Sequence, residues 1–185
     1  TGVSKTLLRS MIKEKIIKYQ LKYRIDNIHI PFKNKSLYEM SFDQGQLLLK
    51  YQESGYKPYL LYTNNEVFVL NFLLKIIEKA IIKQQKVIIF APTIMVIEKV
   101  KLFLDRNLDG VRIDTFHSQN TQSENYESYM DVKHNNYDCF LTTPMGAFLP
   151  FVDVSEIIVL DEENNSYISE NYPYYDVRRW LETRS

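Results

Sequence analysis

Apolar positions recur along the chain at two kinds of spacing. In residues 4–16 they follow a helical period behind Ser4, and serine is a residue type that favours the N-cap of a helix. In residues 19–25 apolar and polar residues alternate, which is typical of a half-buried strand. We therefore predict a basic helix followed by a strand at the start of the chain.

Beyond a linker that begins at Pro31, the pattern changes to short apolar runs separated by longer helical stretches. The expected strands are residues 59–62, 86–90, 111–116, 139–142 and 157–160, and the expected helices are residues 66–84, 94–107 and 123–135. Strands that read as continuous apolar runs and alternate with helices indicate a parallel sheet covered on both faces. The sequence therefore predicts an α/β fold.

Composition narrows the class of protein. The hydrophobic share is 45% and the charged share 25%, which is typical of a globular chain. No run of 18 apolar residues is present, and the basic, amphipathic start lacks the apolar stretch of a signal peptide, so we expect a cytoplasmic protein without a membrane partner. The single cysteine, Cys139, excludes an internal disulfide framework and a cysteine-rich zinc site, and we expect it to pack as a small apolar residue.

Charge is distributed unevenly although the net charge is zero. Residues 1–40 hold nine basic and three acidic residues, a balance of +6, and the remaining 14 basic and 20 acidic residues give −6. A basic head on an acidic body indicates that nucleic-acid contact belongs to the head, although a run of charge is also what an ordinary solvated face shows. The candidate DNA-binding residues are Lys5, Arg9, Lys13, Lys15, Lys22 and Arg24.

One acidic pair is a candidate for chemistry. Asp161 and Glu162 come just after an apolar run, where P-loop NTPases place the carboxylates that serve Mg²⁺ and the attacking water. The alternative is an ordinary acidic strand-to-loop transition. The five glycines are too widely spaced to form a loop that cradles phosphate.

Histidines and tyrosines carry weaker signals. His29, His117 and His134 have no histidine or cysteine neighbours at ligand spacing, so we expect surface or loop histidines and no metal site. Several of the 14 tyrosines lie between Tyr167 and Tyr175. They suit either stacking on bases or packing in a protein interface, and the second is the commoner use of clustered tyrosines.

Several segments together point to a known family. The strongest is residues 151–163, an apolar strand that runs into Asp161-Glu162-Glu163 and is followed by Tyr167. The others are residues 2–16, 41–46, 91–94, 116–118, 143–148, 173–179 and 184–185. Taken together, and in the order in which they occur along the chain, these segments resemble the PriA-type primosomal helicases (primosomal protein N-prime), which restart stalled replication forks. The resemblance spans nearly the whole chain.

The main departure from the family concerns phosphate binding. In the family, the first strand of the RecA-like lobe runs into a glycine-rich loop that holds the phosphate-binding lysine. Four residues stand here in its place, Tyr62, Thr63, Asn64 and Asn65. Both glycines and the lysine are missing, so we expect ATP and Mg²⁺, the cofactors that the resemblance implies, not to bind.

Smaller departures concern neighbouring motifs. Asn164 replaces the histidine that follows the acidic residues in the family, and Thr93 replaces a glutamate after Pro92. We therefore expect Asp161 and Glu162 to be vestiges of a Walker B site.

The resemblance implies a domain organisation and a function. Residues 1–30 would be the C-terminal part of a winged-helix DNA-binding domain, residues 31–40 a linker, and residues 41–185 the first, degenerate RecA-like helicase lobe. The expected function is a DNA-binding and primosome-assembly module that has lost ATP hydrolysis, and the implied partners are forked or junction DNA, primosome proteins and single-strand DNA-binding protein. The alternatives are a fragment of an active ATP-dependent helicase and a module that binds only proteins.

Overall fold

The computed structural model describes residues 42–53 and 58–183. The chain divides into two compact units, Thr1–Pro31 and Phe32–Ser185, and every described residue belongs to the second. The elements are α2 (Phe42–Glu53), α3 (Glu66–Ile82), β1 (Lys86–Phe90), α4 (Ile94–Asn107), β2 (Ile113–Phe116), α5 (Gln122–Lys133), β3 (Cys139–Thr142), the 3-10 helix η3 (Pro144–Phe148), β4 (Val154–Val159), the 3-10 helix η4 (Asn165–Tyr167) and α6 (Val177–Glu182). The helix and strand predicted within residues 4–25 lie outside the described residues, as does the linker.

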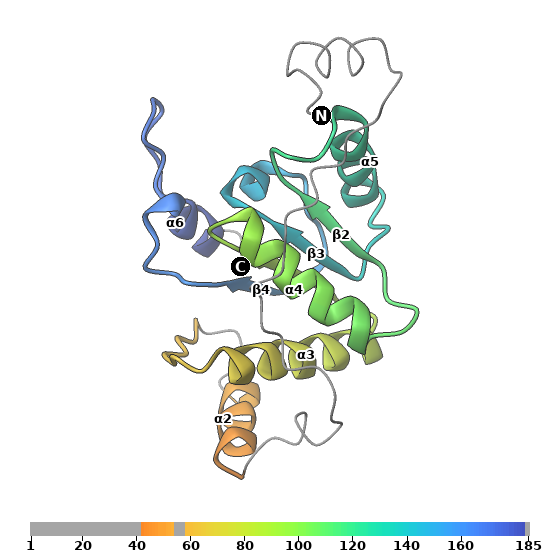
Figure 1. Ribbon diagram of the computed structural model, residues 1–185, viewed down its shortest axis with the longest axis vertical. Helices are drawn as coiled ribbons and strands as arrows, with labels where there is room; N and C mark the ends of the chain where they lie inside the picture. The colour runs from red at the N-terminus through yellow and green to blue at the C-terminus, as the bar shows by residue number, and fades with distance from the viewer. Residues whose placement is uncertain (1–41, 54–57, 184–185) are drawn as a thin grey trace, which may run out of the picture. The chain divides into compact units, whose positions relative to one another are not determined.

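The four strands form one parallel sheet in the order β2-β3-β1-β4 (Figure 1). Ile88 of β1 lies between Phe140 of β3 and Ile157 of β4 in the register. The two central strands are almost wholly buried, as their continuous apolar sequences predict for strands covered on both faces. The α/β fold is therefore confirmed, and it is of the RecA-like type.

Each face of the sheet has its own cover. Successive side chains of a strand point to opposite faces, so Ile88 and Phe90 belong to one cluster, which also holds Tyr137, Tyr167 and Leu181. On the other face, α4 contacts β2 and β3, and α3 contacts β1, as Figure 1 shows for α4 crossing the sheet. The first half of α3 also forms a smaller cluster with one side chain of β4 and with α2, through Phe68, Phe72, Ile158, Leu47 and Leu48.

The predicted helices and strands agree with the structure except at one place. Strands 86–90 and 139–142 and helix 94–107 occur as predicted, and the other segments shift by a few residues at their ends. The strand predicted at residues 59–62 is wrong, because this segment has no place in the sheet and leaves the side chains of Leu60 and Tyr62 exposed at 74% and 93%. Leu61 packs against the α3 cluster, and the ring of Tyr59 contacts that of Tyr51 in α2, but the segment lacks the two covered faces that a buried strand needs.

No helix among the described residues is long and apolar enough to cross a membrane.

Candidate functional site

The carboxyl ends of the parallel strands meet at one edge of the sheet, where α/β proteins usually bind ligands. The loops that leave β1, β3 and β4 are tied together there by backbone hydrogen bonds. Ala91 N–H donates to Thr142 O at 2.9 Å, and Leu160 N–H donates to Phe90 O at 2.9 Å. This edge therefore brings the acidic segment after β4 beside the Ala91-Pro92 turn after β1.

Asp161 and Glu162 lie in a tight, exposed turn at this edge. The φ of Asp161 is 47°, in the left-handed region that aspartate tolerates better than most residues. Asn164 N–H closes the turn on Asp161 O at 2.9 Å, and Asn164 Oδ1 accepts from Ser166 N–H at 3.0 Å. The turn is thus built by its own backbone and by Asn164, and the two carboxylates point their charge into solvent.

Tyr167 fixes this turn to the ends of β1 and β4. Its buried hydroxyl donates to Leu160 O at 2.6 Å and lies 3.2 Å from Phe90 O. Burial raises the pKa of this phenol, so it remains a hydrogen-bond donor at any ordinary pH. Tyr167 therefore fixes the end of β4 against the end of β1.

Arg178 of α6 holds the turn from the other side. Its Nη1 donates to Glu162 O at 2.7 Å, and its Nε and Nη2 donate to the two carboxylate oxygens of Asp176 at 2.8 and 2.7 Å. These hydrogen bonds from Arg178 hold the pKa of Asp176 below its usual range. Sequence reasoning did not single out Arg178, although the resemblance at residues 173–179 covers this position.

By the resemblance in the sequence, the beginning of α3 is the position expected for a phosphate-binding helix. Asn65 caps the helix, because its Oδ1 accepts from Phe68 N–H at 3.0 Å, and Asn65 N–H in turn donates to Thr63 Oγ1 at 3.1 Å. Glu66 follows in the first turn and pairs with Lys99 of α4. One of the N–H groups that an anion would use is therefore bonded to a side chain of the protein, and a carboxylate lies at the positive end of the helix dipole.

Exposed aromatic side chains gather on an arm between η4 and α6. The arm folds back on itself through an antiparallel bridge between Ile168 and Asp176. Figure 1 shows it projecting past α6. At its tip Tyr172 and Tyr174 are exposed at 88% and 75%, with ring centroids 6.4 Å apart.

A second group of rings lies at the base of this arm. Phe148 of η3 contacts Tyr175 and Trp180, with ring centroids 5.1 and 5.6 Å apart. The indole N–H of Trp180 donates to Ala147 O at 3.1 Å, which fixes the ring to η3. Part of each of these three rings remains exposed.

The expectation for the histidines is a place on the surface or in a loop. His134 is exposed at the end of α5, and His117 lies in the loop after β2, although its side chain is buried at 4% exposure. The turn after β2 contacts Glu98 of α4 and Asn125 of α5. Hydrophobic periodicity along the sequence does not record such contacts between elements.

Cys139 is buried as expected, and burial raises the pKa of its thiol to about 12. Within residues 42–53 and 58–183, no three His, Cys, Asp or Glu side chains group to hold a metal ion.

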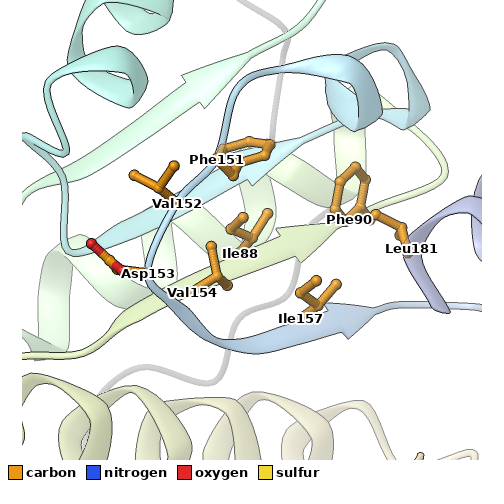
Figure 2. Close-up of a pocket in the computed structure, with 8 residues that line it drawn as sticks. All are labelled: Ile88, Phe90, Phe151, Val152, Asp153, Val154, Ile157 and Leu181. Atoms are coloured by element: carbon orange, nitrogen blue, oxygen red, sulfur yellow. The ribbon is translucent and has the colours of Figure 1, made fainter. Parts of the chain in front are cut away.

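A cavity of about 210 Å³ lies on the sheet (Figure 2). Its floor is formed by β1 and β4, and α6 contributes Leu181. The lining is Ile88, Phe90, Phe151, Val152, Asp153, Val154, Ile157 and Leu181. A cavity with a single carboxylate among apolar side chains has no group to receive the phosphates of a nucleotide.

The candidate DNA-binding residues Lys5, Arg9, Lys13, Lys15, Lys22 and Arg24 lie outside the described residues.

Comparison with known proteins identifies relatives. The protein is 27% identical over 181 residues to the replication restart protein PriA of Buchnera aphidicola subsp. Acyrthosiphon pisum (strain APS), a match that covers 96% of this chain and 24% of the relative. The PriA of Buchnera aphidicola subsp. Schizaphis graminum (strain Sg) is 25% identical over 123 residues, covering 66% of this chain and 17% of the relative. The chain therefore spans about a quarter or less of the length of these relatives.

Two solved structures are also similar. The helicase domain of Hef from Pyrococcus furiosus matches with a TM-score of 0.42 and 20% identity, covering 62% of this chain and 22% of that one. The C-terminal part of the Fun30 ATPase domain matches with a TM-score of 0.45 and 16% identity, covering 80% and 46%.

A family model described as "Helicase conserved C-terminal domain" matches residues 69–166. It describes a C-terminal helicase domain, whereas the resemblance in the sequence placed the chain in the first lobe, so the assignment to the first lobe stays a prediction. Because the model matches more than half of the chain, and the chain is also similar to PriA, the protein belongs to the helicase conserved C-terminal domain family.

Proposed function

We propose that this chain is a DNA-binding and primosome-assembly module of a replication-restart protein, and that it does not hydrolyse ATP. Its curated relatives are named replication restart protein PriA. The observation that supports the loss of ATP hydrolysis is the start of α3, where Asn65 caps the helix and Glu66 adds a carboxylate at the position that the resemblance assigns to the phosphate-binding loop.

A phosphate site at a helix start needs free backbone N–H groups and a cation. At α3, Asn65 Oδ1 already accepts the hydrogen bond of Phe68 N–H, and Glu66 adds a negative charge. Lys99 of α4, a cation at this position, is paired with Glu66. An incoming triphosphate would have to displace these contacts and then meet the repulsion of the carboxylate.

The acidic turn supports the same proposal. Asp161 and Glu162 are exposed, and Mg²⁺ bound through one or two carboxylates usually needs the substrate phosphates as further ligands. Without a phosphate site at α3, these carboxylates have no partner to complete such a site. Replacement of Glu162 by Gln is therefore expected to leave DNA binding unaltered and stability within about 0.5 kcal/mol.

The aromatic arm supports contact with single-stranded nucleic acid. Tyr172 and Tyr174 expose most of their rings, and Arg179 is exposed in the adjoining helix. Base stacking on aromatic rings contributes about 1–3 kcal/mol per base and tolerates any sequence, which suits a protein that acts at many different DNA sites.

Calorimetric titration of the complete chain with MgATP tests the loss of the nucleotide site. We expect no saturable binding at micromolar nucleotide, whereas a PriA-type protein with an intact P-loop should bind under the same conditions. A one-to-one isotherm, with ATP hydrolysis abolished by Glu162→Gln, would instead establish the active-helicase alternative.

A fluorescence titration with a labelled single-stranded oligonucleotide tests the arm. The double variant Tyr172→Ser/Tyr174→Ser should bind at least about fivefold more weakly, since even one lost stacked base costs about 1 kcal/mol. The matched control is Tyr126→Ser/Tyr129→Ser, which removes two exposed rings of α5. Equal affinity of both variants and the unmodified chain would show that the arm does not stack on DNA, and would favour the protein-interface alternative.

A further inference from the structure

His117 is a buried titratable residue that the proposed function does not use. It follows β2 and is 4% exposed, and neither ring nitrogen has a hydrogen-bond partner among the described residues. Its Nε2 lies 3.5 Å from Glu98 Oε1 of α4, which is longer than an ordinary hydrogen bond. The imidazole is thus held inside the protein with one carboxylate nearby but with no hydrogen bond of ordinary length.

Helix α5 is attached to the protein partly through the turn that contains His117. Only Ser128 and Val132 of this helix are buried, so few apolar contacts hold it. Polar contacts to the end of β2 supplement them, since Asn125 Nδ2 donates to His117 O at 3.1 Å and Ser128 Oγ donates to Thr115 O at 3.0 Å. A segment held in this way opens more easily than one anchored in the core.

The charged groups that face the imidazole come from two helices. Glu98 lies on α4, and Glu124 lies at the start of α5, where its carboxylate accepts from Thr121 N–H at 2.6 Å in a capping box. Burial lowers the pKa of His117, and the attraction of Glu98 and Glu124 offsets only part of that effect. Protonation is therefore easier when the turn opens than when it is closed.

We propose that protonation of His117 releases helix α5 from β2. When the imidazole takes up a proton, the charged ring leaves its buried position and moves outward toward Glu98 and solvent. The backbone carbonyl that holds Asn125 moves with it, and α5 detaches from β2. The closed form is fully stable above about pH 6.5, the value for an exposed histidine, and loses stability as the pH falls toward the lower pKa of the buried ring.

Hydrogen exchange of the complete chain at about pH 7 and about pH 5.5 tests this proposal. After correction for intrinsic exchange rates, protection of the α5 amides should fall between the two values by at most about tenfold, the limit set by an exposed histidine of pKa about 6.5. Protection in α3 should stay constant. The variant His117→Gln cannot take up the proton, so its α5 protection should not change with pH, and Glu98→Gln should enlarge the fall.

Two results would overturn the proposal. One is an equal loss of α5 protection in His117→Gln and in the unmodified chain, which would assign the effect to other groups. The other needs no variant: if the imidazole of His117, followed by NMR, titrates at or above about 6.5, the closed state does not resist protonation and no release can be built on it.

Discussion

Gly146 of η3 shows how closely single residues are packed at the end of β3. A Cβ added at this glycine would lie 2.8 Å from Thr142 Cβ and closer still to Thr142 Oγ1. The threonine cannot move aside freely, because it is fully buried and its hydroxyl donates to Phe116 O at 2.9 Å. The close approach therefore requires glycine.

We expect Gly146→Ala to lower the free energy of unfolding by about 1–3 kcal/mol, because the added methyl group overpacks this contact. Urea unfolding followed by circular dichroism would measure the change. The control is Gly45→Ala in α2, where no atom lies within 4 Å of the added Cβ and stability should rise by up to about 1 kcal/mol. Equal stability of Gly146→Ala and the unmodified chain would contradict the packing argument.

Asp138, just before β3, joins the amino ends of three strands. Its Oδ2 accepts from Arg112 N–H at 3.0 Å, and its Oδ1 lies 3.4 Å from Lys86 Nζ. Burial alone would raise the pKa of Asp138, but the Arg112 N–H and the Lys86 ammonium outweigh burial and hold the pKa below its usual range. The ionised form therefore stabilises the folded state.

We expect Asp138→Asn to lower the free energy of unfolding at neutral pH by about 1–2 kcal/mol. Because the folded-state pKa is depressed, the stabilisation is present above the unfolded pKa of about 4 and is lost as the pH falls through the folded pKa. The difference between variant and unmodified chain should thus shrink in acid. Asp105→Asn, which removes an exposed ion pair with Lys101, is the control and should cost no more than about 0.5 kcal/mol at any pH.

At the scale of elements, α6 and the acidic turn are joined through Arg178. The guanidinium donates to Glu162 O and to Asp176, so it links a strand-to-loop transition with the first turn of a helix 16 residues later. Truncation of this side chain should free the turn without unfolding the sheet, because the sheet has its own cores on both faces.

We expect Arg178→Ala to be cleaved several-fold faster by a glutamate-specific protease at Glu162 and Glu163. Exposed turns that lose their side-chain ties open locally, and proteolysis follows the population of the open form. Arg179→Ala removes the neighbouring exposed arginine and should be cleaved at the unmodified rate. Identical rates for both variants would show that Arg178 does not hold the turn.

At the scale of the whole molecule, the uneven charge decides where DNA should bind. Residues 1–40 carry +6 and the remainder −6, so the body should repel the phosphate backbone and the head attract it. Each basic side chain that neutralises a phosphate releases counterions. Four such contacts predict a slope of about −3.6 in a log–log plot of affinity against salt.

We expect the double variant Arg9→Ala/Lys13→Ala to flatten this slope by roughly 2 units. Fluorescence anisotropy with duplex DNA over a salt series would measure it on the complete chain. The control is Lys83→Ala/Lys133→Ala, which removes two exposed lysines of the body and should leave the slope unchanged. If the control flattens the slope and Arg9→Ala/Lys13→Ala does not, the body rather than the head binds DNA.

The sequence by itself determined the elements whose pattern is local. β1, β3 and α4 occur where their apolar runs and helical periods predict them, because a strand buried on both faces or a helix with one apolar stripe needs no distant residue to be recognised. The acidic pair was also found from sequence, since it directly follows an apolar run. The same reasoning failed at residues 59–62, whose apolar side chains satisfy the strand pattern but have no place in the sheet.

Only the tertiary structure decided how the candidate site is held and what occupies it. Three contacts join residues that belong to different elements. They are the hydrogen bond of Tyr167 to the end of β1, the hydrogen bond of Arg178 to Glu162, and the approach of His117 to Glu98 of α4. The pairing of Glu66 with Lys99 at the start of α3 is of the same kind. Such contacts form only when elements pack, so local periodicity, which records the burial of each element separately, contains no information about them.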